Sequence, residues 1–425
     1  MNNNMNNINT KTTTVSTVNY PVYYPHEDSY LIQKHIVEYA KNKEFVLDMG
    51  TGTGILAREA AKYAKKVLAL DINQEALKIA EAAVEKEKSS SSSNNIIFKH
   101  SDLFSSLNNS KNHNNNQFDL IIFNPPYLPK DNQLPDIALD GGKNGYELIG
   151  RFLDVASGYL NNEGVILLLF SSLTKKNKVD EYIKKNLFEK REIDSEKFSF
   201  EELYVYEIKK TKLLQQLEEN NIMKIKYFTR GNRGILYRGR YKQKNKLLDI
   251  VIKTKNDNST ALNRIQNEVF ILSKFKEKKI EFTPDVLLSN EDFFVYEFID
   301  GELIEEYLNK ASQEEIVNIL KKILEFVFKL DQLKINKEEM HRPVKHILIT
   351  KDKEIKMIDF ERAHYTDHPK NLTQFCQFLT GVRLGSIFKK KEIKLNKKNI
   401  LTLAKKYRKN PDEKIYKKIA EEIMF

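Results

Sequence analysis

The fold of the first half of the chain is decided by residues 45–54, which read FVLDMGTGTG. The apolar run at the start of this stretch predicts a short buried strand, and the residues that follow it have the pattern of a helix. Between the two, Gly50, Gly52 and Gly54 lack a Cβ, so the backbone can turn tightly and approach a ligand closely. NAD-dependent enzymes use nearly the same turn, so the glycines alone predict a bound nucleotide without identifying it.

An acidic residue follows the next predicted strand. Asp71 comes directly after residues 67–70, at about the spacing of 20 residues that dinucleotide-binding folds place between the glycine turn and a ribose-binding carboxylate. Its two oxygens can accept hydrogen bonds from both ribose hydroxyls. Asp71 therefore indicates a ligand with a ribose, whichever cofactor carries it.

A third signal, Asn124-Pro125-Pro126-Tyr127, follows the predicted strand 120–123. Open α/β sheets bind ligands at this edge. The two prolines fix φ and remove N–H donors, which leaves the Asn124 side chain and the Pro125 carbonyl as an acceptor pair with one donor. Such a pair fits a planar NH₂ group whose lone pair is steered toward an electrophilic methyl, and Tyr127 can stack on the plane. No general base is needed, because the proton can leave after the nitrogen is alkylated.

Short apolar runs alternate with helical segments around these motifs, which predicts a Rossmann-like, doubly wound α/β sheet. Residues 198–209 alternate in a way that suggests closing antiparallel strands. The predicted strands are 45–47, 67–70, 96–98, 120–123 and 165–170, and the predicted helices include 55–64 and 74–87.

Low-complexity and charged stretches divide the chain. Residues 1–19, the serine run 89–93 and the Asn-rich 108–116 have too few apolar residues to bury and predict a disordered tail and two surface loops. The predicted domains are 20–210 and 222–425, joined by a charged linker at 211–221. The second domain has strands first and helices later, which predicts a two-lobed α+β fold.

Composition limits the class of protein. The 425 residues are 40% hydrophobic and 30% charged, and their mean hydropathy is −0.54, values typical of a folded domain rather than a disordered chain. The longest aliphatic run, 165–170, is far shorter than a membrane span, and the N-terminus does not resemble a secretory signal. The single cysteine, Cys376, excludes an internal disulfide and a Cys-based zinc site, so we expect a cytoplasmic protein.

Taken together, residues 20–210 resemble S-adenosylmethionine-dependent methyltransferases with an N-P-P-Y motif, specifically the release-factor glutamine methyltransferases of the archaeal and eukaryotic type. That family has a seven-stranded sheet of this kind. The resemblance also includes the entry segment Tyr24-Pro25-His26-Glu27-Asp28-Ser29, Asp102-Leu103 after a strand, and the glycine-rich segment 139–145.

The resemblance implies N5-methylation of the glutamine in the Gly-Gly-Gln loop of a peptide-chain release factor, with a small zinc-finger protein as activator. The catalytic residues that it implies are Asn124, Pro125 and Tyr127. The residues that it implies for binding S-adenosylmethionine are Ser29, Asp48, Gly50, Gly52, Gly54, Asp71, Asp102, Leu103 and Asn124. The same motif also serves adenine-N6 methylation of nucleic acid, which stays open as an alternative.

The second half contains four elements in the order found in protein kinases. Gly231 and Gly234 lie in a glycine turn between β-type segments that can cover phosphates. Lys253 ends an alternating strand, and Glu268 follows in a helix, which suits a lysine on the α- and β-phosphates of ATP held by a glutamate. Residues 295–301 resemble an interlobe hinge, and Met357-Ile358-Asp359-Phe360-Glu361 resembles the D-F-G segment, with Asp359 as the Mg²⁺ ligand.

These residues resemble atypical archaeal-type serine/threonine kinases, but the catalytic loop departs from the usual H-R-D pattern. Anchoring it on the apolar run 347–349 places His341 at the position of the base and His346 at that of the second metal ligand. Imidazole is a poor ligand for Mg²⁺. His341, Glu339 and Lys345 all remain candidates for the base, and both an active kinase and a nucleotide-binding pseudokinase remain open.

The net charge of +11 is concentrated near the C-terminus, where residues 381–425 hold 14 Lys/Arg and 5 Asp/Glu. A solvated helical face explains this excess most simply. The alternative is a translation-associated RNA-binding module that contacts RNA or the ribosome through this segment and uses both nucleotide pockets for regulation.

Overall fold

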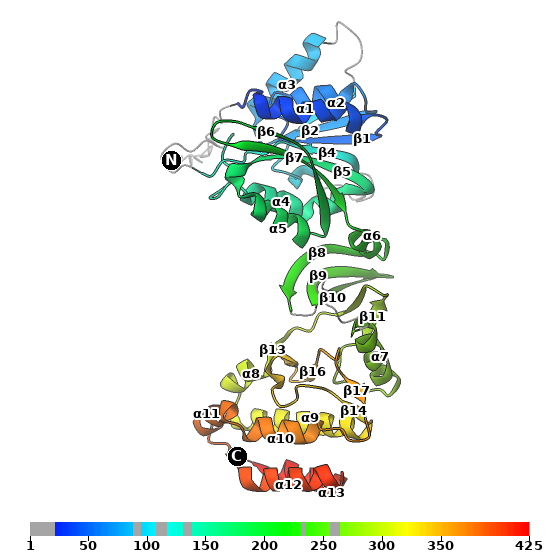
Figure 1. Cartoon of the computed structure of the whole chain (residues 1–425), viewed down its shortest axis with the longest axis vertical. Coiled ribbons are helices and arrows are strands. Elements are labelled where there is room, and N and C mark those ends of the chain that lie inside the picture. Colours follow the sequence, from blue (N-terminus) through cyan, green and yellow to red (C-terminus); the bar gives the residue numbers. More distant parts are fainter. Residues whose placement is uncertain are drawn as a thin grey trace, which may run out of the picture. The chain divides into compact units, whose positions relative to one another are not determined.

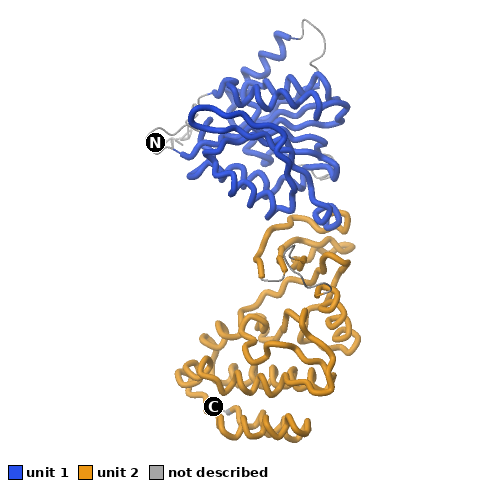
Figure 2. Tube along the Cα trace, viewed as in Figure 1, with its two compact units in different colours: residues 1–217 blue, residues 218–425 orange. Residues whose placement is uncertain are grey.

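The computed structural model describes residues 22–87, 95–107, 117–130, 138–231, 234–255 and 264–424. The predicted tail 1–19 and both predicted surface loops lie outside these residues. The chain forms two compact units, Met1–Leu217 and Glu218–Phe425 (Figure 2). The division falls inside the predicted linker, which is the helix α6 (Lys212–Glu219) and buries Leu214 and Leu217.

The first unit is built on a seven-stranded sheet in the order β3-β2-β1-β4-β5-β7-β6. The five strands from β3 to β5 run parallel, and β7 and β6 close the sheet antiparallel. The predicted Rossmann-like sheet is therefore confirmed. The strands are β1 (Phe45–Met49), β2 (Lys66–Asp71), β3 (Ile96–His100), β4 (Phe118–Phe123), β5 (Leu160–Ser171), β6 (Phe188–Lys197) and β7 (Glu202–Lys210).

Helices cover both faces of this sheet, with α1 and α2 on one side and α4 and α5 on the other (Figure 1). One core joins apolar side chains of α1 and α2 to those that β1, β2, β4, β5 and β7 turn toward them. On the other face Phe152 of α4 packs against Phe123 of β4, with ring centroids 4.4 Å apart. The helices are α1 (Glu27–Ala40), α2 (Ile55–Ala61), α3 (Gln74–Glu87), α4 (Glu147–Ala156) and α5 (Lys176–Lys185).

The closing antiparallel strands predicted over residues 198–209 are confirmed from residue 202 onward, as β7, but were misplaced before it. Phe198 and Phe200 lie in the turn between β6 and β7, and Phe200 is 93% exposed. The strand β6 lies before them and is largely charged and exposed because it forms the edge of the sheet. It therefore lacks the apolar alternation on which the prediction depended.

The second unit begins with a five-stranded antiparallel sheet in the order β11-β12-β10-β9-β8, accompanied by the helix α7 (Arg264–Glu277). This is the small lobe of the predicted two-lobed fold, and the hairpin predicted near Phe293 is β11 with β12. The strands are β8 (Ile222–Arg230), β9 (Gly234–Gln243), β10 (Lys246–Lys255), β11 (Val286–Ser289) and β12 (Phe293–Glu297).

The rest of the second unit is mainly helical and is centred on α9 (Gln313–Gln332). A capping box starts α9: the Ser312 side chain accepts from the Glu315 N–H, and the Glu315 side chain accepts from the Ser312 N–H. The other helices are α8 (Ile304–Lys310), α10 (Asn371–Thr380), α11 (Val382–Lys390), α12 (Lys397–Lys409) and α13 (Glu413–Glu421). Small sheets contain β13 (Gly301–Leu303), β14 (Ile335–Asn336), β15 (Ile347–Thr350), β16 (Ile355–Met357), β17 (His364–Tyr365), β18 (Lys394–Leu395) and β19 (Ile423–Met424).

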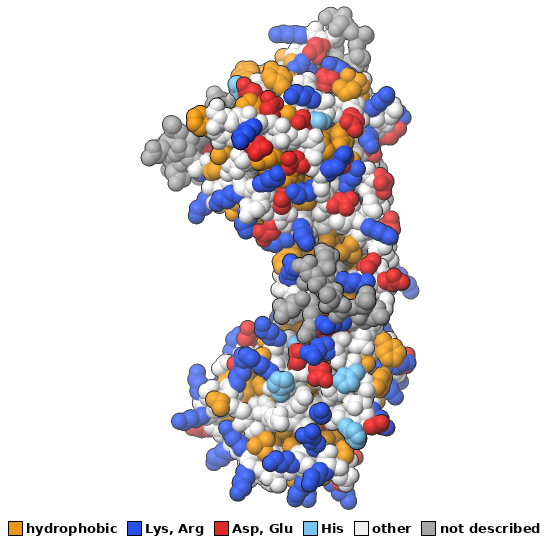
Figure 3. All heavy atoms as spheres, viewed as in Figure 1, with side chains coloured by type: hydrophobic (Ala, Val, Ile, Leu, Met, Phe, Trp, Pro, Cys, Tyr) orange, Lys and Arg blue, Asp and Glu red, His pale blue; other side chains and the backbone are white. Residues whose placement is uncertain are grey.

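Lys and Arg side chains gather over the C-terminal helices on the face drawn in Figure 3, in agreement with the excess of basic residues in 381–425. Among the residues that the structure describes, no helix combines the length and the apolar character needed to cross a bilayer.

Candidate active sites

A pocket of about 380 Å³ lies in the first unit, beside the carboxyl ends of β1, β2 and β4. The glycine turn and Asp71 form one part of its wall and the Asn-Pro-Pro-Tyr corner another, so motifs about 75 residues apart meet in one crevice. The predicted residues that line it are Ser29, Gly50, Gly52, Asp71, Asp102, Leu103, Asn124, Pro125 and Tyr127.

The glycine turn and Asp71 are joined by hydrogen bonds. The Gly52 N–H donates to one Asp71 oxygen at 2.8 Å, and the Asn73 N–H donates to the other at 2.8 Å. Gly50 and Gly52 have φ values of +67° and +55°, a region that favours glycine. Burial raises the pKa of Asp71 above its usual value, although the backbone hydrogen bonds oppose this effect. Asp71 thus stands in a fixed position at the pocket wall.

The structure does not bring Asp48 and Gly54 to the pocket wall. Asp48 is completely buried below the turn, where it accepts a hydrogen bond from the Thr51 hydroxyl at 2.6 Å, and burial raises its pKa to about 7. Gly54 caps α2 with a φ of +79°, and a Cβ there would lie 3.0 Å from the Cβ of Ala80. Both residues shape the turn from behind.

The Asn-Pro-Pro-Tyr corner is anchored to α1. The Asn124 Nδ2 donates to an Asp28 oxygen at 2.9 Å, while the Asn124 Oδ1 is buried without a hydrogen-bond partner among the residues described. The other Asp28 oxygen accepts from the Ser29 N–H at 2.6 Å and from the Tyr23 hydroxyl at 2.8 Å. The entry segment recognised in the sequence contains Asp28, but no role was predicted for this residue. The signal was available, since this carboxyl group adjoins Ser29, a predicted cofactor residue.

The glycine-rich segment 139–145 supports the same corner. The Leu128 N–H donates to the Leu139 carbonyl at 2.9 Å, and the Gly141 N–H donates back to the Leu128 carbonyl at 2.9 Å. A Cβ on Gly141 would lie 2.6 Å from the carbonyl oxygen of Pro126, and one on Gly145 would lie 2.4 Å from that of Tyr127. Only glycine allows this segment to pack so closely against the corner.

The residues of this pocket fit the S-adenosylmethionine that the resemblance implies. A carboxylate lies at the pocket wall where a ribose can be held, the glycine turn leaves room for a close approach, and the Asn124 side chain that also lines the pocket has a buried oxygen without a partner among the described residues. Burial raises the pKa of Tyr127, so its hydroxyl stays neutral beside the corner.

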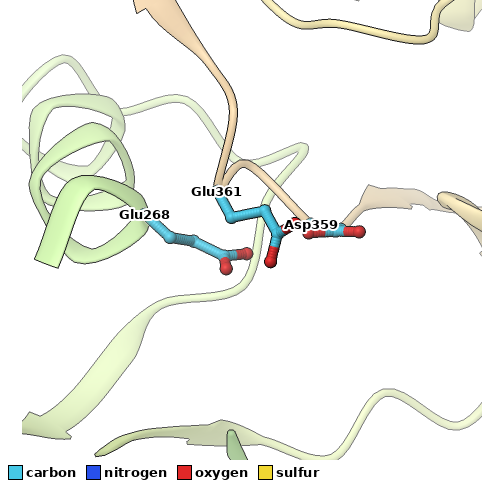
Figure 4. A group of neighbouring side chains, drawn as sticks. All are labelled: Glu268, Asp359 and Glu361. Carbon is cyan, nitrogen blue, oxygen red and sulfur yellow. The ribbon is translucent and has the colours of Figure 1, made fainter. Parts of the chain in front are cut away.

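In the second unit a lysine is surrounded by three carboxylates. The Lys253 Nζ lies 2.6 Å from Glu268, 3.1 Å from Asp359 and 3.5 Å from Glu361. The three acidic side chains converge from α7 and from the segment after β16, with ligand atoms within 4.8 Å of one another (Figure 4). Burial alone would lower the pKa of Lys253, but the carboxylates raise it above its usual value. Glu361, for which the sequence predicted no role, occupies the position of the glycine of D-F-G and contacts Lys253.

The predicted glycines lie beside this cluster. The Gly231 N–H donates to the Gly234 carbonyl at 2.9 Å at the turn from β8 to β9, and a Cβ on Gly234 would lie 3.6 Å from the Lys253 Cε. The two residues between these glycines lie outside the described part of the chain.

The catalytic loop brings His346 to the site but leaves His341 exposed. The His346 Nε2 lies 3.5 Å from an Asp359 oxygen, and burial lowers its pKa to about 4. No described hydrogen bond or ion pair joins His341 to Lys253 or Asp359. Glu339 lies nearer: one oxygen is 4.0 Å from the His346 Nε2, and the other accepts from Arg362 at 2.8 Å.

A buried lysine that the sequence did not single out completes this site. The Lys337 Nζ donates to the backbone carbonyl of Asp359, and its backbone N–H donates to Asn371 at 2.8 Å. Burial lowers the pKa of Lys337 to about 8. Lys337 therefore helps to hold Asp359, whose φ of +65° is unusual for a residue other than glycine.

Two family models match the chain: the methyltransferase small domain over residues 27–201 and the protein tyrosine and serine/threonine kinase over residues 222–375. A putative protein N5-glutamine methyltransferase of Methanocaldococcus jannaschii is 41% identical over 191 residues, which cover 43% of this chain and 89% of the relative. A release factor glutamine methyltransferase of Streptococcus pneumoniae is 29% identical over 177 residues, which cover 39% of this chain and 59% of the relative.

Solved structures with similar folds include the E. cuniculi Mtq2–Trm112 complex, described as responsible for methylation of the eRF1 translation termination factor. It is 25% identical, has a TM-score of 0.35 and covers 45% of this chain and 99% of its own. A structure of WbdD with a kinase inhibitor is 15% identical, has a TM-score of 0.42 and covers 91% of this chain and 86% of its own.

Proposed function

The chain belongs to the protein N5-glutamine methyltransferases, and on this basis we propose that its first unit methylates the Gly-Gly-Gln glutamine of a peptide-chain release factor, with S-adenosylmethionine as the methyl donor. The observation that supports this proposal best is the buried Asn124 Oδ1, which has no partner among the described residues and belongs to a side chain that lines the same pocket as Gly50 and Asp71. A glutamine side chain offers the N–H donor that this oxygen lacks.

In the proposed mechanism the chain acts mainly by binding and orientation. When bound, S-adenosylmethionine supplies an electrophilic methyl group. Asn124 Oδ1 and the Pro125 carbonyl accept the two amide N–H groups, which points the nitrogen toward that methyl, and Tyr127 stacks on the amide plane. The acceptors also stabilise the positive charge that develops on the nitrogen, whose proton then leaves to water. Asp71, Asp102 and the glycine turn hold the donor.

This function is tested by incubating the purified chain with release factor, labelled S-adenosylmethionine and a small zinc-finger activator, which we propose as its partner. Label is expected on the Gly-Gly-Gln glutamine, and more of it with the activator. Asn124→Ala should abolish transfer and leave S-adenosylmethionine affinity nearly unchanged. An unlabelled release factor would contradict the proposal. Label on DNA offered in competition would instead identify an adenine-N6 methyltransferase.

The second unit supports a further candidate function, ATP-dependent phosphoryl transfer, which the contacts of Lys253 with Glu268 and Asp359 favour. We propose that Lys253 holds the phosphates of ATP and that Asp359 binds Mg²⁺, because a carboxylate is a hard ligand suited to that ion. Glu339, next to His346, is better placed than His341 to accept the proton of an acceptor hydroxyl.

Lys253→Ala and Asp359→Ala are each expected to lower ATP turnover at least tenfold, and the control His341→Ala, in the predicted catalytic loop, is expected to change it little. Turnover unaffected by the first two would remove the site assignment. ATP binding without turnover in the unsubstituted chain would identify a regulatory pseudokinase.

A further inference from the structure

The Asn124 side chain has a fixed polarity. An ionised carboxylate only accepts hydrogen bonds, so the Asn124 Nδ2, 2.9 Å from Asp28, must be the end that faces Asp28. The Oδ1 is then the opposite end of the amide, a buried atom without a partner among the described residues, on a side chain that lines the pocket. The orientation of this amide follows from the chemistry of its neighbour.

Asp28 is itself held in place. It is 4% exposed and lies in the first turn of α1, where the helix dipole favours a negative charge. The Ser29 N–H and the Tyr23 hydroxyl occupy one of its oxygens and leave the other for Asn124. A carboxylate bound on both oxygens cannot rotate to release the amide without losing several hydrogen bonds.

We propose that Asp28 is a positioning residue that sets the polarity of Asn124 and thereby selects glutamine over glutamate. With Oδ1 presented, the corner offers acceptors only, which an amide NH₂ satisfies and a carboxylate of the same shape does not. A glutamate carboxylate would place acceptor oxygens against the acceptors of the corner, and these buried groups would stay without hydrogen bonds. The free energy lost in this way lets a site reject a ligand of nearly the same shape. This inference rests on the proposed methyl transfer.

The test uses the full chain and two Gly-Gly-Gln loop peptides, one with glutamine and one with glutamate at the same position. Peptide binding is measured with S-adenosylhomocysteine bound, and kcat is measured with S-adenosylmethionine and the glutamine peptide. Asp28→Asn keeps the side-chain shape but offers both a donor and an acceptor. The Asn124 amide can then rotate so that its Oδ1 and Nδ2 exchange places. The binding preference for the glutamine peptide is expected to fall at least tenfold, and kcat to fall at least tenfold, while cofactor affinity changes less than twofold. Glu27→Gln, an exposed neighbour on the same helical turn, is the matched control and should retain both properties.

The reciprocal exchange, Asp28→Asn combined with Asn124→Asp, guards against simple misfolding. The amide at position 28 can then donate to the carboxylate at position 124, whose second oxygen again faces the substrate as an acceptor. The exchange should therefore bind the glutamine peptide at least tenfold more tightly than Asn124→Asp alone. A structural role for Asp28 predicts no such rescue.

The possible outcomes separate this inference from the function on which it rests. Transfer by the unsubstituted chain with an unchanged preference in Asp28→Asn, or an exchange no better than Asn124→Asp, overturns the role of Asp28 alone. Failure of the unsubstituted chain to methylate either release factor or peptide overturns both proposals. Lost selectivity together with rescue supports both.

Discussion

Asp48 carries a carboxyl group that folding removes from water completely, and burial raises its pKa to about 7. In the unfolded chain the same group titrates near pH 4. The folded chain therefore holds this proton more tightly, so the contribution of Asp48 to stability is greatest below about pH 4 and is lost as the pH rises toward 7.

The neutral variant Asp48→Asn cannot lose a proton and keeps an acceptor for Thr51. The difference in unfolding free energy between this variant and the parent should be larger at pH 8 than at pH 5 by at least about 1 kcal/mol. The reason is that the parent loses stability as Asp48 is deprotonated, and one unit of pKa shift corresponds to about 1.4 kcal/mol. Denaturant titration at both pH values measures this, with the exposed Glu75→Gln as control. An equal difference at both pH values would contradict it.

The sequence predicted a site residue where its own position next to a strand end was enough to place it. Gly50 and Asn124 directly follow strands and Asp71 is the last residue of one, and the parallel topology brings strand ends together at one edge. The role of Asp28 could not be derived in this way, because it depends on a contact with a residue 96 positions away. His341 was assigned by counting from an apolar run, which fixes register but not side-chain direction.

The segment 139–145 packs against the Asn-Pro-Pro-Tyr corner and holds it in position. A Cβ on Gly141 would lie 2.3 Å from the Gly145 carbonyl oxygen and 2.6 Å from that of Pro126, so the backbone at one of these positions must move. Gly141→Ala is expected to lower kcat for methyl transfer at least 100-fold, since a small misplacement of the acceptors is costly.

The matched control for this substitution is Gly158→Ala, where a Cβ would meet nothing within 4 Å. Single-turnover kinetics and S-adenosylmethionine binding measure the two effects separately. Full activity of Gly141→Ala would show that the segment does not hold the corner.

Elements with buried apolar runs were predictable, and those defined by their position in the sheet were not. The strands β1, β2, β4 and β5 bury most of their residues and were found from the sequence. The strand β6 has one fully buried residue, Phe188, and pairs only with β7, so its strand character comes from its partner.

At the scale of the whole molecule, the hydrophobic core cluster described in the first unit and the one described in the second share no residue. We expect calorimetry to resolve two unfolding transitions, each responding to one ligand. S-adenosylmethionine at 100 times its dissociation constant should stabilise the first unit by about 2.7 kcal/mol and leave the other transition unchanged, and ATP with Mg²⁺ should act in reverse. A single transition raised by both ligands would show that the units unfold together.

Only two residues, Asn220 and Asn221, separate the end of α6 from the start of β8. One messenger and one round of translation therefore deliver both units in equal numbers, and neither can be produced, diluted or inherited without the other. Whatever ratio two separate polypeptides would have reached through their own expression levels is fixed here at one to one.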